Sequence, residues 1–220
     1  MHVKLKTWLL LVAFILVPLT PVHAEPTTSH TPSSKGAGEA GSNLRLFLFV
    51  HDQVSAQERA ELGSGYLNTY LAHLEEITGR RTTVTIITNK PGFTDFGYRR
   101  DNWEQLLRDW SSTSIRYANE NNLPRPSERH KYMLLTSNKI DWLTHGLSAP
   151  ELNVGIASLK MYNTVGHEIG HLLGATHEAA TGFPCQTIMW GDALTTGINP
   201  CYYFSEANQN AILEHLKNAP

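Results

Sequence analysis

Residues 167–177 read HEIGHLLGATH and place three histidines at fixed offsets in an otherwise apolar frame. His167 and His171 are four residues apart, so on a helix they lie on one face, about 40° apart around the axis. Both imidazoles can therefore reach one bound ion. His177 follows the second histidine after six residues and is a further candidate ligand.

The third histidine cannot share the helical face of the first two, so we expect the helix to end soon after His171. Gly174 suits the required turn, because helices commonly end at a glycine in the left-handed conformation, where a side chain would be strained. The prediction is a helix, a turn at Gly174, and a chain that returns His177 to the same ion.

Three imidazoles with one open coordination position are typical of a catalytic zinc site. Glu168 directly follows the first histidine and is predicted to act as a general base rather than as a ligand. Zinc lowers the pKa of a water molecule to roughly 7, where a carboxylate can deprotonate it. The alternative is an amphipathic helix that carries His-Glu-x-x-His by chance, but the added Gly174 and His177 favour the metal site.

The pattern HExxHxxGxxH followed by a methionine resembles the metzincin clan of zinc endopeptidases. The matching methionine is Met189 in CQTIMW, residues 185–190, twelve residues after His177. The resemblance implies peptide hydrolysis with one catalytic zinc, and a methionine turn that forms a hydrophobic base beneath the histidines. Glu178, at the position after the third histidine, resembles the astacin pattern, whereas the spacing of Cys185 before Met189 resembles the adamalysin pattern. The subfamily therefore stays open.

The N-terminus is predicted to be a signal peptide, residues 1–24. Lys4 and Lys6 precede an apolar run at 8–18, and compact residues lead up to a cleavage site after Ala24. The run is shorter than the roughly 20 apolar residues of a membrane-spanning helix, so no stable membrane insertion is expected after cleavage. The protein is expected to be secreted or periplasmic.

Residues 25–43 are rich in Pro, Ser, Thr and Gly without an apolar period, which predicts a flexible leader. The chain has 18 basic and 20 acidic residues, a formal net charge of -2. No run of basic residues is visible along the sequence, so neither nucleic acid nor anionic lipid is predicted as a partner.

Cys185 and Cys201 are the two cysteines of the chain. In an exported protein such a pair is expected to form a disulfide, here one that clamps the segment around Met189. Closing a loop of this size contributes roughly 3 kcal/mol on the chain-entropy model. The alternative is a pair of unbonded buried thiols.

Apolar or β-branched runs predict three strands, at residues 44–50, 82–88 and 131–137. A helix from the Ser55 to Glu58 capping box, ending at Gly79, separates the first two. A second helix begins around 101–104, and its predicted buried face is Trp103, Leu106, Leu107 and Trp110. A serine cluster at 111–114 obscures its end. This alternation indicates a parallel α/β sheet.

The remaining elements complete a metzincin-like α/β domain at 44–217, with a mixed, mostly parallel twisted sheet and long helices. Residues 139–150 have a weak pattern and would supply an antiparallel edge strand, followed by an inner strand at 154–159 and the active-site helix from 161–164. The two expected subdomains are 44–174, and 175–217 with the methionine turn and a terminal helix from Ser205.

The leading functional hypothesis is a secreted zinc endopeptidase that acts on proteins or peptides. One alternative is the enzymatic subunit of a toxin or host-interaction complex, although the sequence indicates no partner subunit. Another is a non-catalytic recognition protein stabilised by zinc. Tyr202 and Tyr203 have two alternative roles: one of them polarises a substrate carbonyl, or both pack against the terminal helix.

Five further histidines have no partner at ligand spacing and are expected to be structural or on the surface: His51, His73, His130, His145 and His215.

Overall fold

The computed structural model describes residues 43–191 and 199–219 of the chain. The predicted signal peptide, and the predicted leader except Asn43, lie outside the described residues. Among the described residues, every helix is too short or too polar to span a lipid bilayer.

Five strands of the described chain form one sheet in the order β2-β1-β3-β5-β4. The bounds are β1 Leu44–Val50, β2 Thr82–Ile87, β3 His130–Thr136, β4 Gly146–Ala149 and β5 Val154–Ser158. All pairs are parallel except β4 with β5, which is antiparallel. The predicted α/β class with a mixed, mostly parallel sheet is confirmed, including the antiparallel edge strand.

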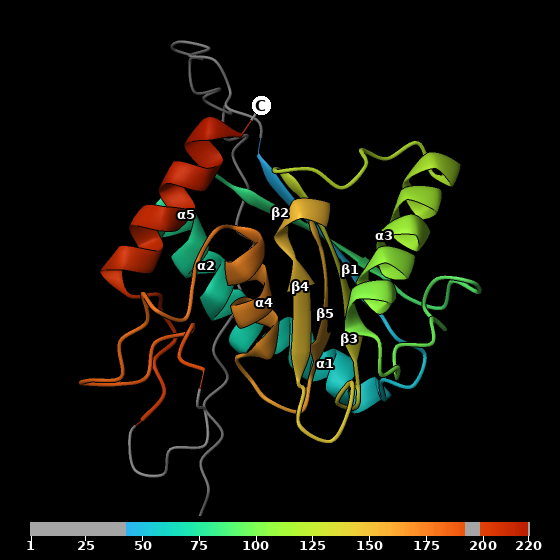
Figure 1. Ribbon diagram of the computed structural model, residues 1–220, viewed down its shortest axis with the longest axis horizontal. Helices are drawn as coiled ribbons and strands as arrows, with labels where there is room; N and C mark the ends of the chain where they lie inside the picture. The colour runs from blue at the N-terminus through green and yellow to red at the C-terminus, as the bar shows by residue number, and fades with distance from the viewer. Residues whose placement is uncertain (1–42, 192–198, 220) are drawn as a thin grey trace, which may run out of the picture. The chain divides into compact units, whose positions relative to one another are not determined.

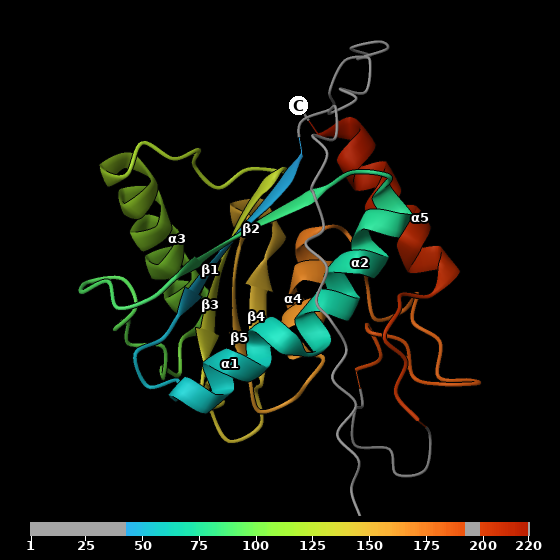
Figure 2. The ribbon, with the colours of Figure 1, turned by 180° about the vertical axis from the view of Figure 1, so that it is seen from behind.

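Helices cover both faces of the sheet (Figures 1 and 2). One face carries α1 Ala56–Ser64, α2 Tyr66–Thr78, α4 Thr164–Leu172 and α5 Glu206–Asn218, and the other carries α3 Trp103–Glu120. A short 3₁₀ helix, η1 Pro150–Leu152, links β4 to β5. Because side chains alternate along a strand, Leu46 and Leu48 enter one core while Phe47 and Phe49 enter the other.

Most predicted helix ends are confirmed by hydrogen bonds. Ser55 and Glu58 form the capping box, with the Glu58 N–H donating to Ser55 Oγ at 3.2 Å and the Ser55 N–H donating to Glu58 Oε2 at 2.8 Å. Asn102 and Ser205 cap α3 and α5 with one hydrogen bond each, in which the side-chain oxygen accepts the N–H of the residue three positions later. Gly79 ends α2 in the left-handed conformation, at φ 61°.

The single helix predicted between Ser55 and Gly79 was wrong, because the chain breaks at Gly65 into α1 and α2. Gly65 has φ -112° and ψ -136°, which is outside the helical region. A Cβ at this position would lie 2.9 Å from the Glu61 carbonyl oxygen. Glycine is the weakest residue in a helix interior apart from proline, and here it also admits this close approach.

One residue predicted for the buried face of α3 was wrong. Trp103 is 44% exposed, because it is the first helical residue and its side chain lies at the surface instead of entering the core. The end of the helix, which the serine cluster left open, lies beyond that cluster. Ser111 and Ser114 are buried against the sheet, and the helix continues to Glu120.

Lys131 is an ionisable side chain with no solvent exposure, between β3 and α5. Its Nζ donates to Asn153 Oδ1 and lies 3.3 Å from His215 Nε2 and 3.8 Å from Glu128 Oε2. Burial lowers the pKa of Lys131 to about 8, despite the nearby Glu128 carboxylate. The buried charge therefore costs stability at neutral pH.

This burial predicts an alkaline rise in stability. Between the folded pKa of about 8 and the ordinary value of 10.5, the unfolded chain binds more protons at Lys131, so the unfolding free energy increases with pH. The rise is up to about 3 kcal/mol across the window. We expect Lys131→Met to flatten it.

Urea unfolding at pH 8.0 and 9.5 measures this effect. The matched control is Lys90→Met, which alters an exposed lysine and should keep the wild-type slope. An equal pH slope in wild type and Lys131→Met would contradict the assignment.

Candidate metal centre

The helix α4 presents His167 and His171 on one face, with ring centroids 4.8 Å apart. The helix stops after Leu172, and Gly174 adopts the left-handed conformation at φ 86°. The Gly174 N–H donates to the His171 carbonyl at 3.0 Å, which closes the turn. The chain then returns His177 to within 4.9 Å of both other rings, as the spacing predicted.

The three imidazoles converge through the same ring atom. His177 Nε2 lies 2.9 Å from His167 Nε2 and 3.1 Å from His171 Nε2. The candidate ligand atoms all lie within 4.8 Å of one another. Within residues 43–191 and 199–219, no other group of three histidine, cysteine or acidic side chains comes this close.

Backbone carbonyls orient two of the rings. His167 Nδ1 lies 2.9 Å from the Ile188 carbonyl, and His171 Nδ1 lies 3.1 Å from the Ala175 carbonyl. A carbonyl only accepts, so each Nδ1 carries the hydrogen and each Nε2 presents its lone pair to the centre of the cluster. This is the arrangement in which histidines bind metals.

The protonation state of the three histidines suits a bound cation. Burial lowers the pKa of His167 to about 4, and burial followed by the nearby His177 lowers the pKa of His171. Both rings are therefore neutral at neutral pH. His177 Nε2 carries at most one hydrogen, so it can donate to only one of the two facing lone pairs. Three convergent nitrogen donors fit a tetrahedral zinc ion with a fourth position left open.

Glu168 lies beside this cluster, buried against the edge strand β4. A Cβ on Gly146 would stand 2.4 Å from Glu168 Oε1, so the carboxyl group occupies the space beside that glycine. Burial raises the pKa of Glu168 to about 7, and a hydrogen bond from the Ser148 side chain opposes the rise. The carboxyl group is thus positioned by two residues of β4.

A hollow of about 220 Å³ joins these groups. Its lining includes Glu168, His167 and His177, with Gly146 at the start of β4 and His145 just before that strand. The rest of the wall is formed by Leu143, Thr144, Met161, Asn163, Thr164, Trp190 and Gly191. A ligand in this hollow would contact both the histidine cluster and the carboxyl group.

Met189 lies under α4 with no solvent exposure. A Cβ on Gly170 would stand 2.6 Å from Met189 Sδ, so the methionine packs directly against the helix that carries two of the histidines. The preceding carbonyl, of Ile188, holds His167. One short segment therefore supports the cluster both by packing and by a hydrogen bond.

A disulfide joins Cys185 to Cys201, as predicted, with Cα atoms 5.5 Å apart. Next to it, the Cys201 N–H donates to the Gln186 carbonyl at 2.8 Å. The carbonyl-polarising role considered for the two following tyrosines gains no support, because neither lines the hollow. Tyr202 packs on other aromatic rings, and Tyr203 Oη lies 3.1 Å from Cys185 Sγ.

Among the described residues there are five further histidines, and four of them have structural partners away from the hollow. These are His51 with Gln53, His73 with Phe204, His130 with Ser127 and His215 with Glu128. His145 differs, because it lines the hollow and its buried Nδ1 has no hydrogen-bond partner among the described residues. Sequence reasoning gave no site role to His145, Gly146 or Ser148. The one available signal was a glycine at the start of a weak strand pattern.

Comparison with solved structures shows similarity of fold. Metalloproteinase-II from Bacteroides fragilis matches with a TM-score of 0.53 and 16% identity, over 80% of this chain and 53% of that chain. A zinc-dependent peptidase from Methanocorpusculum labreanum (strain Z) matches with a TM-score of 0.46 and 18% identity, over 76% and 99% of the two chains. Neither the protein-family models nor the curated proteins gave a match.

The contact between Gly146 and Glu168 predicts a specific coupling between two substitutions. Gly146→Ala adds a Cβ where the carboxyl group lies, so we expect the unfolding free energy to fall by about 1–3 kcal/mol. In a Glu168→Ala background the space is free, and the same substitution should cost much less.

Urea unfolding of the four proteins in this double-mutant cycle measures the coupling. Gly97→Ala is the control, because the atom nearest to its Cβ would be Arg100 Nη2 at 3.9 Å, an ordinary van der Waals distance. Additive effects of Gly146→Ala and Glu168→Ala would show that the glycine does not set the position of the carboxyl group.

Proposed function

We propose that this protein is a zinc endopeptidase of the metzincin type, exported by a signal peptide at residues 1–24. In this assignment His167, His171 and His177 hold one zinc ion, and Glu168 is the general base. The observation that carries the proposal is the convergence of three Nε2 atoms beside a buried carboxyl group, with that carboxyl group and two of the histidines lining one hollow. The similar Bacteroides fragilis structure is named a metalloproteinase, which agrees with it.

A bound zinc ion would supply a Lewis acid that polarises a peptide carbonyl and lowers the pKa of a water molecule. Glu168 accepts a proton from the attacking water on its carboxylate and passes it to the leaving amine nitrogen. Glu168 thus acts first as a base and then as an acid. The Ser148 hydrogen bond keeps the carboxyl group in place.

The edge strand β4 offers a binding surface for an extended substrate. Its one partner in the described sheet is β5, so the other edge has free backbone donors and acceptors. An extended peptide can pair with such an edge. Gly146 and Ser148 of β4 contact Glu168, so a peptide bound there would run past the proposed base.

The metal assignment predicts about one zinc ion per chain, because three histidines and an open position form a single site. His171→Ala should lose most of the zinc, since two imidazoles hold it weakly. The control is His130→Ala, whose ring contacts Ser127 away from the cluster. Elemental analysis after purification without chelator measures the zinc content per chain. A zinc content in His171→Ala equal to that of wild type would reject the proposed ligand set.

The base assignment predicts that Glu168→Gln keeps the fold and the zinc but loses peptide hydrolysis. Removing a general base lowers kcat by roughly 10²–10⁴-fold. Glutamine preserves the volume of this buried side chain, so a loss reports on the proton acceptor. Glu178→Gln makes the same chemical change at an exposed site and should stay within a few-fold of wild type.

Peptide-library hydrolysis by the zinc-loaded proteins, with a chelated sample as blank, provides the measurement. Wild-type rates in a folded, zinc-loaded Glu168→Gln protein would show that another group takes the proton.

A further inference from the structure

A second depression, of about 500 Å³, lies beside the catalytic hollow and has no role in the mechanism above. It is lined by residues 138–142 together with Arg99 and Lys160, and we call it the basic pocket. Its cations come from three separate segments: Arg99 precedes α3, Lys139 follows β3 and Lys160 follows β5. This is the edge where parallel strands end, the usual place for ligands in open α/β sheets.

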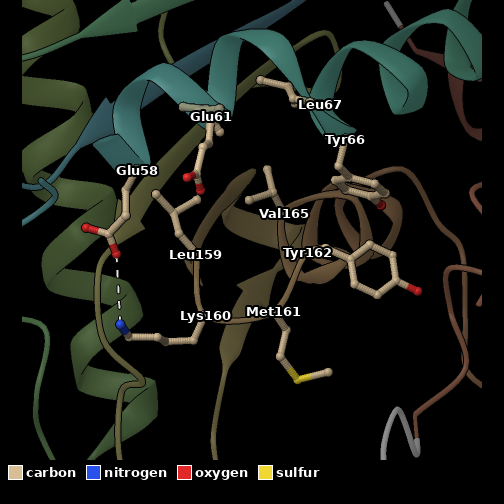
Figure 3. Close-up of a pocket in the computed structure, with 11 residues that line it drawn as sticks. Glu58, Glu61, Tyr66, Leu67, Leu159, Lys160, Met161, Tyr162 and Val165 are labelled. Carbon is tan, nitrogen blue, oxygen red and sulfur yellow. Dashed lines mark ion pairs between the residues drawn. The ribbon is translucent and has the colours of Figure 1, made fainter. Parts of the chain in front are cut away.

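The basic pocket has more positive than negative charge. Arg99 and Lys139 form no ion pair with a described carboxylate. Lys160 Nζ lies 3.9 Å from Glu58, and Figure 3 shows its side chain extended toward that residue. Asp141 lines the pocket, but its Oδ1 accepts the backbone N–H groups of the following loop.

The surplus of positive charge does not continue beyond Arg99. A neighbouring depression shares Arg99 but adds Asp52 and Asp95, together with Arg100, which pairs with Asp109. The basic pocket therefore has a larger surplus of cations than this neighbouring depression. An anion of limited size would be attracted there, whereas a long polyanion would also meet the acidic neighbours.

Trp142 adds an apolar surface to the basic pocket. Its side chain is 82% exposed, and the adjacent Leu143 is 62% exposed. Two exposed apolar side chains in sequence gain free energy when a ligand covers them. Together with Arg99 and Lys139, they favour a ligand that carries both negative charge and an apolar group.

One loop connects the basic pocket to the catalytic hollow. Residues 138–142 line the pocket, and residues 143–146 line the hollow. On the opposite wall, Lys160 belongs to the pocket and the next residue, Met161, to the hollow. A peptide paired with β4 would leave the strand at Gly146 and pass onto this loop.

We propose that the basic pocket binds an acidic segment of the polypeptide substrate, one that includes an apolar residue and lies outside the cleaved bond. This inference rests on the proposed peptidase function and specifies its substrate class. A nucleic acid fits less well, because its affinity depends on many phosphate contacts, whereas this pocket offers three cations on a chain of net charge -2.

Paired peptides test the proposal. Both peptides contain the same neutral core, which is the best-cleaved member of a library. In the acidic peptide the core is extended at either end by a run of glutamates with one leucine. In the control peptide serines replace the glutamates and the leucine is kept. We expect wild type to cleave the acidic form with roughly three- to tenfold higher kcat/KM, the range of a few exposed ion pairs. The preference should shrink as salt screens the charges.

The double variant Arg99→Gln/Lys139→Gln should bring the ratio of the two kcat/KM values close to one. The matched control is Arg125→Gln/Lys217→Gln, which removes the same charge at exposed sites outside the pocket and should keep the wild-type ratio. Equal cleavage of both peptides by wild type, or an unchanged ratio in the pocket variant, would overturn the proposal.

A binding measurement separates this proposal from the peptidase assignment. Fluorescence anisotropy of the labelled acidic extension is followed on the Glu168→Gln protein with and without the pocket substitutions. Binding that the pocket substitutions abolish supports the pocket even if no peptide is cleaved, in which case the proposed function alone fails. Absence of binding, or stronger pocket-dependent binding to phosphatidylserine vesicles than to the peptide, would reject an acidic polypeptide as the occupant.

Discussion

The turn at Gly174 is the constraint on which the histidine cluster depends. At φ 86° this residue reverses the chain one turn after His171, a conformation that strains any residue with a Cβ. The reversal places the Ala175 carbonyl on His171 and the His177 ring beside the other two. A longer helix would carry the third imidazole away from the first two, so the end of α4 and the ligand set are one structural feature.

Close approach at glycines holds α4 in place. A Cβ on Gly166 would lie 2.3 Å from the Tyr66 hydroxyl, and one on Gly170 would lie 2.6 Å from Met189 Sδ. Gly146 of β4 makes the equivalent approach to Glu168. The helix that carries the proposed site is therefore packed closely against α2, the methionine segment and the edge strand, because a glycine at each contact leaves room for the facing side chain. Such dense packing limits the movement of the rings.

The predictions from the sequence were most accurate for features formed by residues that are close together in the chain. The histidines and Gly174 lie within eleven residues, so helical periodicity and one turn were enough to bring them together. The break at Gly65 was missed because the capping box at Ser55 and the apolar stripe that begins at Tyr66 were assigned to the same helix. The basic pocket was not predicted for a different reason. Arg99, Lys139 and Lys160 are far apart in the sequence, and the order of the strands in the sheet brings them together. A search for basic runs could not find it.

The loop before β4 is fixed in shape although its tip is exposed. The Ile140 side chain is buried, its N–H donates to the Thr144 carbonyl at 2.9 Å, and Asp141 accepts two further N–H groups. This hydrogen-bonded turn therefore fixes the backbone at Trp142, whose side chain is exposed to solvent. Because the turn is already ordered, a ligand that covers the indole pays little conformational entropy in this loop. The same rigidity fixes the start of β4 and hence Gly146 beside Glu168, so contacts at the basic pocket and the position of the proposed base depend on one loop.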